Sequence, residues 1–179
     1  IVFGLVGSEM CIRDSFEQVF NRASTFPYWF ATIALLASSS SYVNALLVRK
    51  LGMRMLTGIA FRAQVCFSAI VFLVYWTGYF EGQFGFFCFL FWMFSIFFQA
   101  GLTMGNLTAL AMEPVGHIAG TAASLVSAIA TIGSVLLAAI VGQFFDGTPA
   151  AMIAGVALFA TLGSVSSHRL KRYDRTTKV

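Results

Sequence analysis

Five polar side chains inside long apolar stretches are the residues of this sequence best suited to contact a polar ligand. They are Asn44, Gln99, Asn106, Ser127 and Thr131. Amides and hydroxyls donate and accept hydrogen bonds, so these residues predict substrate contacts in a cavity. The same groups also form hydrogen bonds between membrane helices, and that alternative stays open.

A compact polar turn joins two apolar stretches and contains the titratable groups that follow Asn106 most closely in the sequence. It holds Glu113, Pro114, Gly116 and His117, and Gly120 follows in a run of small residues. Pro114 disfavours helix at the preceding residue, so one helix should end near Met112 and another should begin after the turn. The carboxylate and the imidazole are able to titrate during proton coupling, although capping and solvation also explain them. We predict a joint between two membrane helices.

The remaining chemistry of the sequence points away from catalysis and from metal binding. The three cysteines, at positions 11, 66 and 88, show neither disulfide nor ligand spacing. The sequence holds no Ser/His/Asp set with plausible geometry and no phosphate-binding glycine loop. We therefore expect no enzyme, no cofactor and no metal site. The net charge of +4 is spread over loops and a tail, so nucleic acid is not an expected partner.

The composition is that of a membrane protein. Of the 179 residues, 59% are hydrophobic and 10% are charged, whereas a soluble domain has about 25% charged residues. The apolar residues fall into runs long enough to cross a bilayer as helices. The sequence therefore predicts an all-α membrane protein with the lipid bilayer as a partner.

Five membrane-spanning helices are expected to position the polar side chains. Their predicted ranges are about 27–48, 56–78, 84–111, 118–144 and 150–165, within a bundle that covers 27–166. An extracytoplasmic loop, 16–26, precedes the bundle, and a basic tail, 167–179, follows it. The five polar residues fall on the first, third and fourth of these helices.

The first fifteen residues differ in origin from the rest in this interpretation. Val6–Asp14 back-translates to a string that resembles a sequencing-library transposon adapter read in frame. We therefore set residues 1–15 aside from the fold and expect the native chain to be cut off, beginning near Phe16. A native loop is the alternative.

The distribution of basic residues predicts the orientation in the membrane. With five crossings, the turns at 49–54 and 113–117 share one side with the tail. That side carries eight Lys and Arg residues, namely Arg49, Lys50, Arg54, Arg169, Lys171, Arg172, Arg175 and Lys178. The other side carries Arg22 when residues 1–15 are left out. Because basic loops stay inside, we expect a multi-pass inner-membrane protein with a cytoplasmic C-terminus.

Two features within the predicted helices leave alternatives open. Arg62 lies inside an apolar stretch, where it either snorkels to the headgroups or acts as a packing or gating partner. The third helix begins with a run of aromatic residues, which is either lipid-facing and packing surface or a site that stacks on a ligand.

Two stretches carry a resemblance to a known family. Asn106–His117 with Ala119–Ser124 is similar to the joint between the tenth and eleventh helices of a subfamily within the major facilitator superfamily, the bicyclomycin/chloramphenicol-resistance (Bcr/CflA-like) drug:proton antiporters. Ala45–Arg54 resembles the second copy of the superfamily's cytoplasmic loop motif, which Gly52 and Arg54 match. Ala45 and Arg49 stand where the better copy has Gly and Asp, so the role of that acid is not carried over.

The resemblance implies the last five of twelve transporter helices, a truncated C-terminal six-helix bundle. The eighth, tenth and eleventh helices would line a substrate cavity, completed by an N-terminal half of the same transporter. It implies a proton-coupled exporter of drugs or other small molecules, with the coupling carboxylates in the other half. An uptake carrier for a metabolite or sugar, and a membrane scaffold without transport, are the alternatives.

Overall fold

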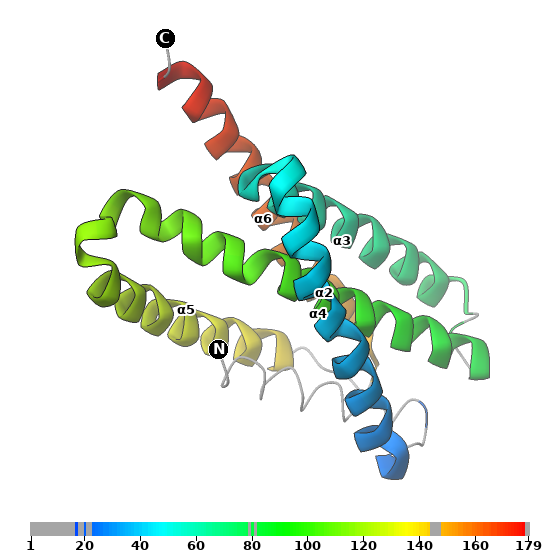
Figure 1. Cartoon of the computed structure of the whole chain (residues 1–179). Coiled ribbons are helices and arrows are strands. Elements are labelled where there is room, and N and C mark those ends of the chain that lie inside the picture. The colour runs from blue at the N-terminus through cyan, green and yellow to red at the C-terminus, as the bar shows by residue number, and fades with distance from the viewer. Residues whose placement is uncertain are drawn as a thin grey trace.

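The computed structural model describes Glu17, Phe20, Phe80 and residues 23–78, 82–143 and 148–177, with side chains as far as Arg169. All secondary structure in these residues is helical (Figure 1). The α helices are α2 (Phe26–Leu51), α3 (Met53–Trp76), α4 (Gly82–Met112), α5 (Ala119–Gln143) and α6 (Ala150–Thr177), and the 3-10 helices are η1 (Ala23–Thr25) and η2 (Glu113–Ile118). The predicted adapter segment 1–15 and most of the predicted loop 16–26 lie outside the described residues.

Four helical segments are long and apolar enough to cross a membrane. They are Phe26–Leu51, Met53–Trp76, Gly82–Gln143 and Ala150–Arg169. The prediction of an all-helical, multi-pass membrane protein is confirmed at this level. The third segment has 62 residues and contains α4, η2 and α5. The count of five crossings remains a prediction.

The predicted basic turn at 49–54 proves to be a single residue. α2 continues through Arg49 and Lys50, and α3 begins at Met53, so Gly52 alone separates the two helices. Its backbone has φ 77°, which glycine adopts without the steric cost that a side chain brings. The Gly52 N–H donates to the Val48 carbonyl at 2.9 Å and caps α2. The basic residues are therefore helical, in the last turn of α2 and the first turn of α3.

Between α4 and α5 the chain turns back on itself. α4 ends at Met112, the residue at which Pro114 predicts a helix end. Val115, with φ −121° and ψ 29°, breaks the helical path inside η2. α5 then runs back along the direction from which α4 came (Figure 1). This geometry agrees with the predicted joint between two helices.

The last helix is longer than predicted. α6 continues from Ala150 to Thr177 and so includes most of the segment predicted as a tail after Val165. Charged residues end an apolar stretch, but Leu, Lys and Arg are good helix formers, and no proline or glycine follows Gly163. The C-terminal part of α6 extends past the ends of the other helices (Figure 1).

The core lies among α2, α3, α4 and α6. α4 packs against α2 and α3, and α3 packs against α6. The side chains of Phe86, Phe89, Trp92, Met93 and Ile153 are almost completely buried. The aromatic residues at the start of α4 therefore form two surfaces. One surface is buried in the core, and the other, with Phe84, Phe87 and Phe91, is more than half exposed. α5 contributes no buried residue.

Candidate functional site

Two of the five predicted cavity residues meet across α2 and α4. Asn106 Nδ2 donates to Asn44 Oδ1 at 2.7 Å and to the Leu102 carbonyl of its own helix at 2.8 Å. Asn106 is 5% exposed, and Asn44 is half-buried. Sequence reasoning placed each residue on a cavity-lining helix but did not predict that the two amides pair. We call them the asparagine pair.

A close approach of α2 and α4 brings the asparagine pair together. A Cβ atom placed on Gly101 would overlap the Ser40 hydroxyl and would lie 2.9 Å from the Ser40 Cβ. Ser40 is itself only 2% exposed. Because Gly101 has no side chain, the two backbones come close enough for two short amide side chains to reach each other. Asn44 follows Ser40 by about one helical turn.

The asparagine pair retains hydrogen-bonding capacity. The two bonds of Asn106 Nδ2 use both of its hydrogens, which leaves Asn106 Oδ1 as an acceptor and Asn44 Nδ2 as a donor. No buried side-chain nitrogen or oxygen within the described part of the chain lacks a partner. Asn44 is half-buried and Asn106 is 5% exposed, so the remaining amide donor is the more open of the two groups.

The other three predicted cavity residues form no hydrogen bond with the asparagine pair. Gln99 is half-buried on α4, and its backbone carbonyl accepts a hydrogen bond from Thr103 Oγ1 at 2.9 Å. On α5, Thr131 Oγ1 donates to the Ser127 carbonyl at 2.8 Å, and Ser127 is exposed. α5 contacts α4 and α6 only sparsely, so its hydroxyl groups are not brought to the asparagine pair.

The predicted loop motif and the predicted joint contact each other. Arg54 Nη2 lies 3.2 Å from Glu113 Oε2, which forms an ion pair between the first turn of α3 and η2. The two side chains are 43% and 63% exposed, so water screens the attraction strongly. Pro114, Gly116, His117 and Gly120 are also exposed. Gly52, Arg54 and η2 therefore lie at the same end of the molecule.

A buried polar cluster between α3 and α4 was missed by sequence reasoning. Trp92 Nε1 donates to Ser68 Oγ at 3.0 Å, and Gln64 Nε2 lies 3.4 Å from the same oxygen. All three side chains are at most 2% exposed. The available signal was a Gln and a Ser four residues apart on one apolar helix, together with a Trp whose indole N–H needs an acceptor. This buried cluster connects α3 to α4 through side-chain hydrogen bonds.

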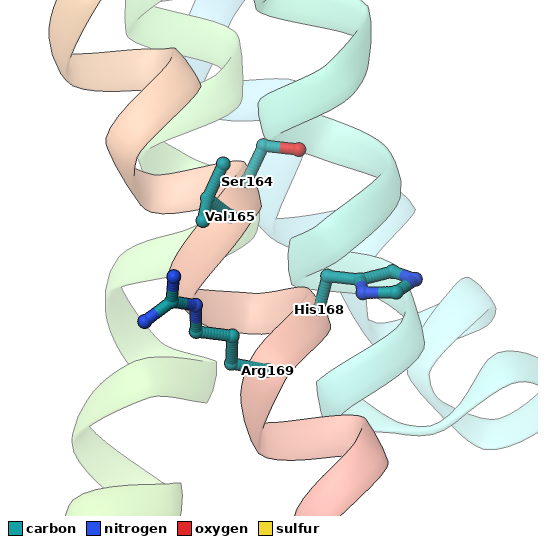
Figure 2. A pocket seen from close by; sticks show the side chains of 4 residues that line it. All are labelled: Ser164, Val165, His168 and Arg169. Atoms are coloured by element: carbon teal, nitrogen blue, oxygen red, sulfur yellow. The ribbon is translucent and has the colours of Figure 1, made fainter.

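A shallow groove lies on α6, and none of the predicted site residues lines it. It has a volume of about 390 Å3 and is lined by Ser164, Val165, His168 and Arg169 (Figure 2). The described residues contain no group of three or more His, Cys, Asp or Glu side chains that could hold a metal ion.

No family model, curated protein or solved structure matches this chain. The resemblance to the major facilitator superfamily is therefore carried by the residues of the two stretches named above and by no independent comparison.

Proposed function

We propose that this chain is part of a secondary active transporter of the major facilitator type, a proton-coupled exporter of drugs or other small molecules. Such a transporter works by alternating access around a site between two six-helix halves. The resemblance to the Bcr/CflA-like antiporters suggests the assignment. The observation that carries it is the asparagine pair, which holds a spare amide donor and a spare amide acceptor between two apolar helices.

The proposed topology has five crossings and a cytoplasmic C-terminus. At 1.5 Å per residue, α4 and α5 measure about 46 Å and 38 Å, so each is long enough to cross a hydrocarbon core of about 30 Å. If the 62 residues from Gly82 to Gln143 crossed the membrane once as one straight helix, that helix would measure about 93 Å, far more than the thickness of the bilayer. The Arg54–Glu113 ion pair supports one shared end for the two turns, as the charge distribution predicts. The proposed membrane is the inner (cytoplasmic) membrane of the cell.

The asparagine pair suits a ligand that is mostly apolar and has few hydrogen-bonding groups. One amide donor and one acceptor supply direction, and nearby apolar side chains supply contact area. Leu110 follows Asn106 by one helical turn on α4, Val48 follows Asn44 by one turn on α2, and both are half-buried. Neutral amides do not bind or release protons near neutral pH. In this proposal proton coupling therefore belongs to the N-terminal half of the transporter, and the chain catalyses no chemical reaction.

A binding assay on the whole chain tests the proposed site. The purified chain in lipid nanodiscs would be titrated with chloramphenicol and with a lipophilic cationic dye, with binding followed by tryptophan fluorescence or by dye anisotropy. Asn106→Ala and Asn44→Ala should each weaken binding about fivefold or more, the value of one hydrogen bond of about 1 kcal/mol. Thr108→Ala is the matched control, since the Thr108 hydroxyl bonds to the Met104 carbonyl of its own helix.

Two outcomes would refute the proposal. If the asparagine variants bound the ligand as tightly as the control, the asparagine pair would not be the binding site. Flux through liposomes that contain this chain alone would contradict the mechanism of two cooperating halves, because alternating access needs both.

The uptake carrier and the scaffold give different results in the same assay. A carrier for a sugar or metabolite should bind polar ligands through the asparagine pair and should not bind the lipophilic dye. A scaffold should bind neither class, and its asparagine variants should change stability alone. Competition between glucose or an amino acid mixture and chloramphenicol separates these alternatives.

A further inference from the structure

The groove on α6 is bounded by two pairs of side chains spaced one helical turn apart. Ser164 and His168 form one edge, and Val165 and Arg169 form the other (Figure 2). His168 and Arg169 are exposed, and Ser164 is half-buried. Among the side chains that the structure describes, which end at Arg169, no carboxylate forms an ion pair with Arg169. The groove therefore offers a guanidinium, an imidazole and a hydroxyl beside one apolar side chain.

The depth of the groove follows from the length of the apolar segment. From Ala150 to His168 the sequence of α6 has no Lys, Arg, Asp or Glu, and Arg169 is its first charged residue. The 20 residues from Ala150 to Arg169 measure about 30 Å of helix, which equals the thickness of a bilayer's hydrocarbon core. The groove therefore lies where hydrocarbon gives way to lipid headgroups, with Val165 on the hydrocarbon side and Arg169 on the headgroup side.

A second cation lies at the same depth on the neighbouring helix. Gly58 of α3 packs against Ser167 of α6, since a Cβ on Gly58 would lie 3.0 Å from the Ser167 hydroxyl. Arg62 Nε donates to the Gly58 carbonyl at 3.1 Å, which draws its side chain back to the level of Ser167. Arg62 is exposed, which agrees with snorkelling rather than with burial against a partner.

The charge that follows the groove is also positive. α6 continues as a helix beyond Arg169, and residues 170–177 include Lys171, Arg172 and Arg175 against Asp174. Basic residues next to a membrane span attract anionic lipids, and the attraction falls off within a Debye length. The groove therefore combines specific donors with a long-range positive field.

We infer that this groove binds the phosphate headgroup of an anionic phospholipid from the surrounding bilayer. The Arg169 guanidinium donates to phosphate oxygens in its fork geometry, and His168 and Ser164 add further donors. Val165 contacts the apolar start of the acyl chains. A free phosphate ion shares the polar chemistry but gains nothing from Val165. The inference depends on the membrane location of the chain and not on the proposed transport function.

Binding of soluble short-chain lipids to the whole chain tests this inference. The chain in detergent would be titrated with dioctanoyl phosphatidylglycerol, with dioctanoyl phosphatidylcholine and with inorganic phosphate, and binding would be read by native mass spectrometry. We expect the anionic lipid to bind more tightly than the other two probes. Arg169→Gln should weaken its binding about fivefold, as one basic residue near an anionic surface contributes. Val165→Glu, which places an acid in the groove, should weaken it as well.

Arg49→Gln is the matched control, because it removes an equal charge from the exposed last turn of α2, outside the groove. Its affinity for the anionic lipid should equal that of the unchanged chain. Equal losses in Arg169→Gln and Arg49→Gln would show diffuse attraction without a site. Equal binding of phosphate and phosphatidylglycerol would make the groove a site for free anions. Either result overturns the inference, and neither bears on drug binding at the asparagine pair.

Discussion

α4 and α5 are consecutive apolar helices joined by one short turn, yet they are packed very differently. α4 has nine buried residues, including Trp92, Met93 and Asn106, and α5 has none. On α5, large apolar side chains such as Ile129 and Ile132 are more than 60% exposed. Near the end of α5, Val141 lies against Gly155 of α6.

The polar residues of the two helices differ in the same way. Asn106 and Trp92 on α4 bond to side chains of other helices. On α5 the hydroxyls of Ser124 and Ser134 bond to carbonyls of their own helix. Composition marks both helices as suited to lipid, but the hydrogen-bond partners show that α4 finds its neighbours in this chain. The surface of α5 is left for lipid or, in the proposed transporter, for the N-terminal half.

The largest effect should come from a side chain placed at the closest contact of α4. Gly101→Leu overlaps Ser40 and must push α2 away, which should lower the free energy of unfolding by about 2–3 kcal/mol. Gly133→Leu on α5 is the matched control, because nothing lies within 4 Å of its Cβ position. It should change stability by about 0.5 kcal/mol or less. SDS-induced unfolding in mixed micelles, followed by circular dichroism, measures both. If both variants lost the same free energy of unfolding, α4 and α5 would not differ in how closely they are packed.

A pair of serine substitutions probes the contrast through hydrogen bonds. Ser68→Ala leaves the Trp92 indole and the Gln64 amide without their shared acceptor, which should cost about 1–2 kcal/mol. Ser134→Ala removes a hydroxyl that bonds within α5 and should cost about 0.5 kcal/mol or less. The same unfolding titration compares them. A cost for Ser134→Ala as large as that for Ser68→Ala would show that α5 is packed after all.

The local features of this fold could be predicted from the sequence, because single residues set them. Pro114 predicts the end of α4 at Met112, and the apolar runs predict the membrane segments. Gly52 was less informative, since a basic stretch looks like a loop even when its residues are helical on both sides of one glycine. The end of α6 was missed for a similar reason, because hydropathy reports where lipid ends and not where a helix ends.

Contacts between helices could not be predicted in the same way. Phe86 and Phe87 are adjacent and equally apolar, but Phe86 is 1% exposed and Phe87 is 51% exposed, because the rotation of α4 turns one inward. That rotation depends on which neighbours pack against α4. The pairing of Asn44 with Asn106, 62 positions apart, depends on the same packing, as does the placement of Ser127 and Thr131 away from them.

A smaller free-energy difference should distinguish a hydrogen bond between two helices from a hydrogen bond within one helix. In a double-mutant cycle, Asn44→Ala and Asn106→Ala should show a coupling free energy of about 0.6 kcal/mol, the usual value for a hydrogen bond between membrane helices. Ser127→Ala and Thr131→Ala should show almost none, since Thr131 bonds to the Ser127 carbonyl, which alanine retains. Unfolding titrations of the six variants supply both cycles. Coupling on α5 equal to that of the asparagine pair would contradict the structure.

The smallest effect should come from the ion pair that connects the packed helices to the turn before α5. Arg54→Gln removes a surface attraction that is worth about 0–1 kcal/mol at low salt and less at high salt. Its cost should therefore fall when the unfolding titration is repeated in concentrated sodium chloride. Lys50→Gln, which removes an exposed charge from the end of α2, should show no comparable dependence on salt. A large, salt-insensitive loss in Arg54→Gln would mean that this contact is shielded from water. The turn would then belong with the packed helices, and the boundary between the two regions would move from η2 into α5.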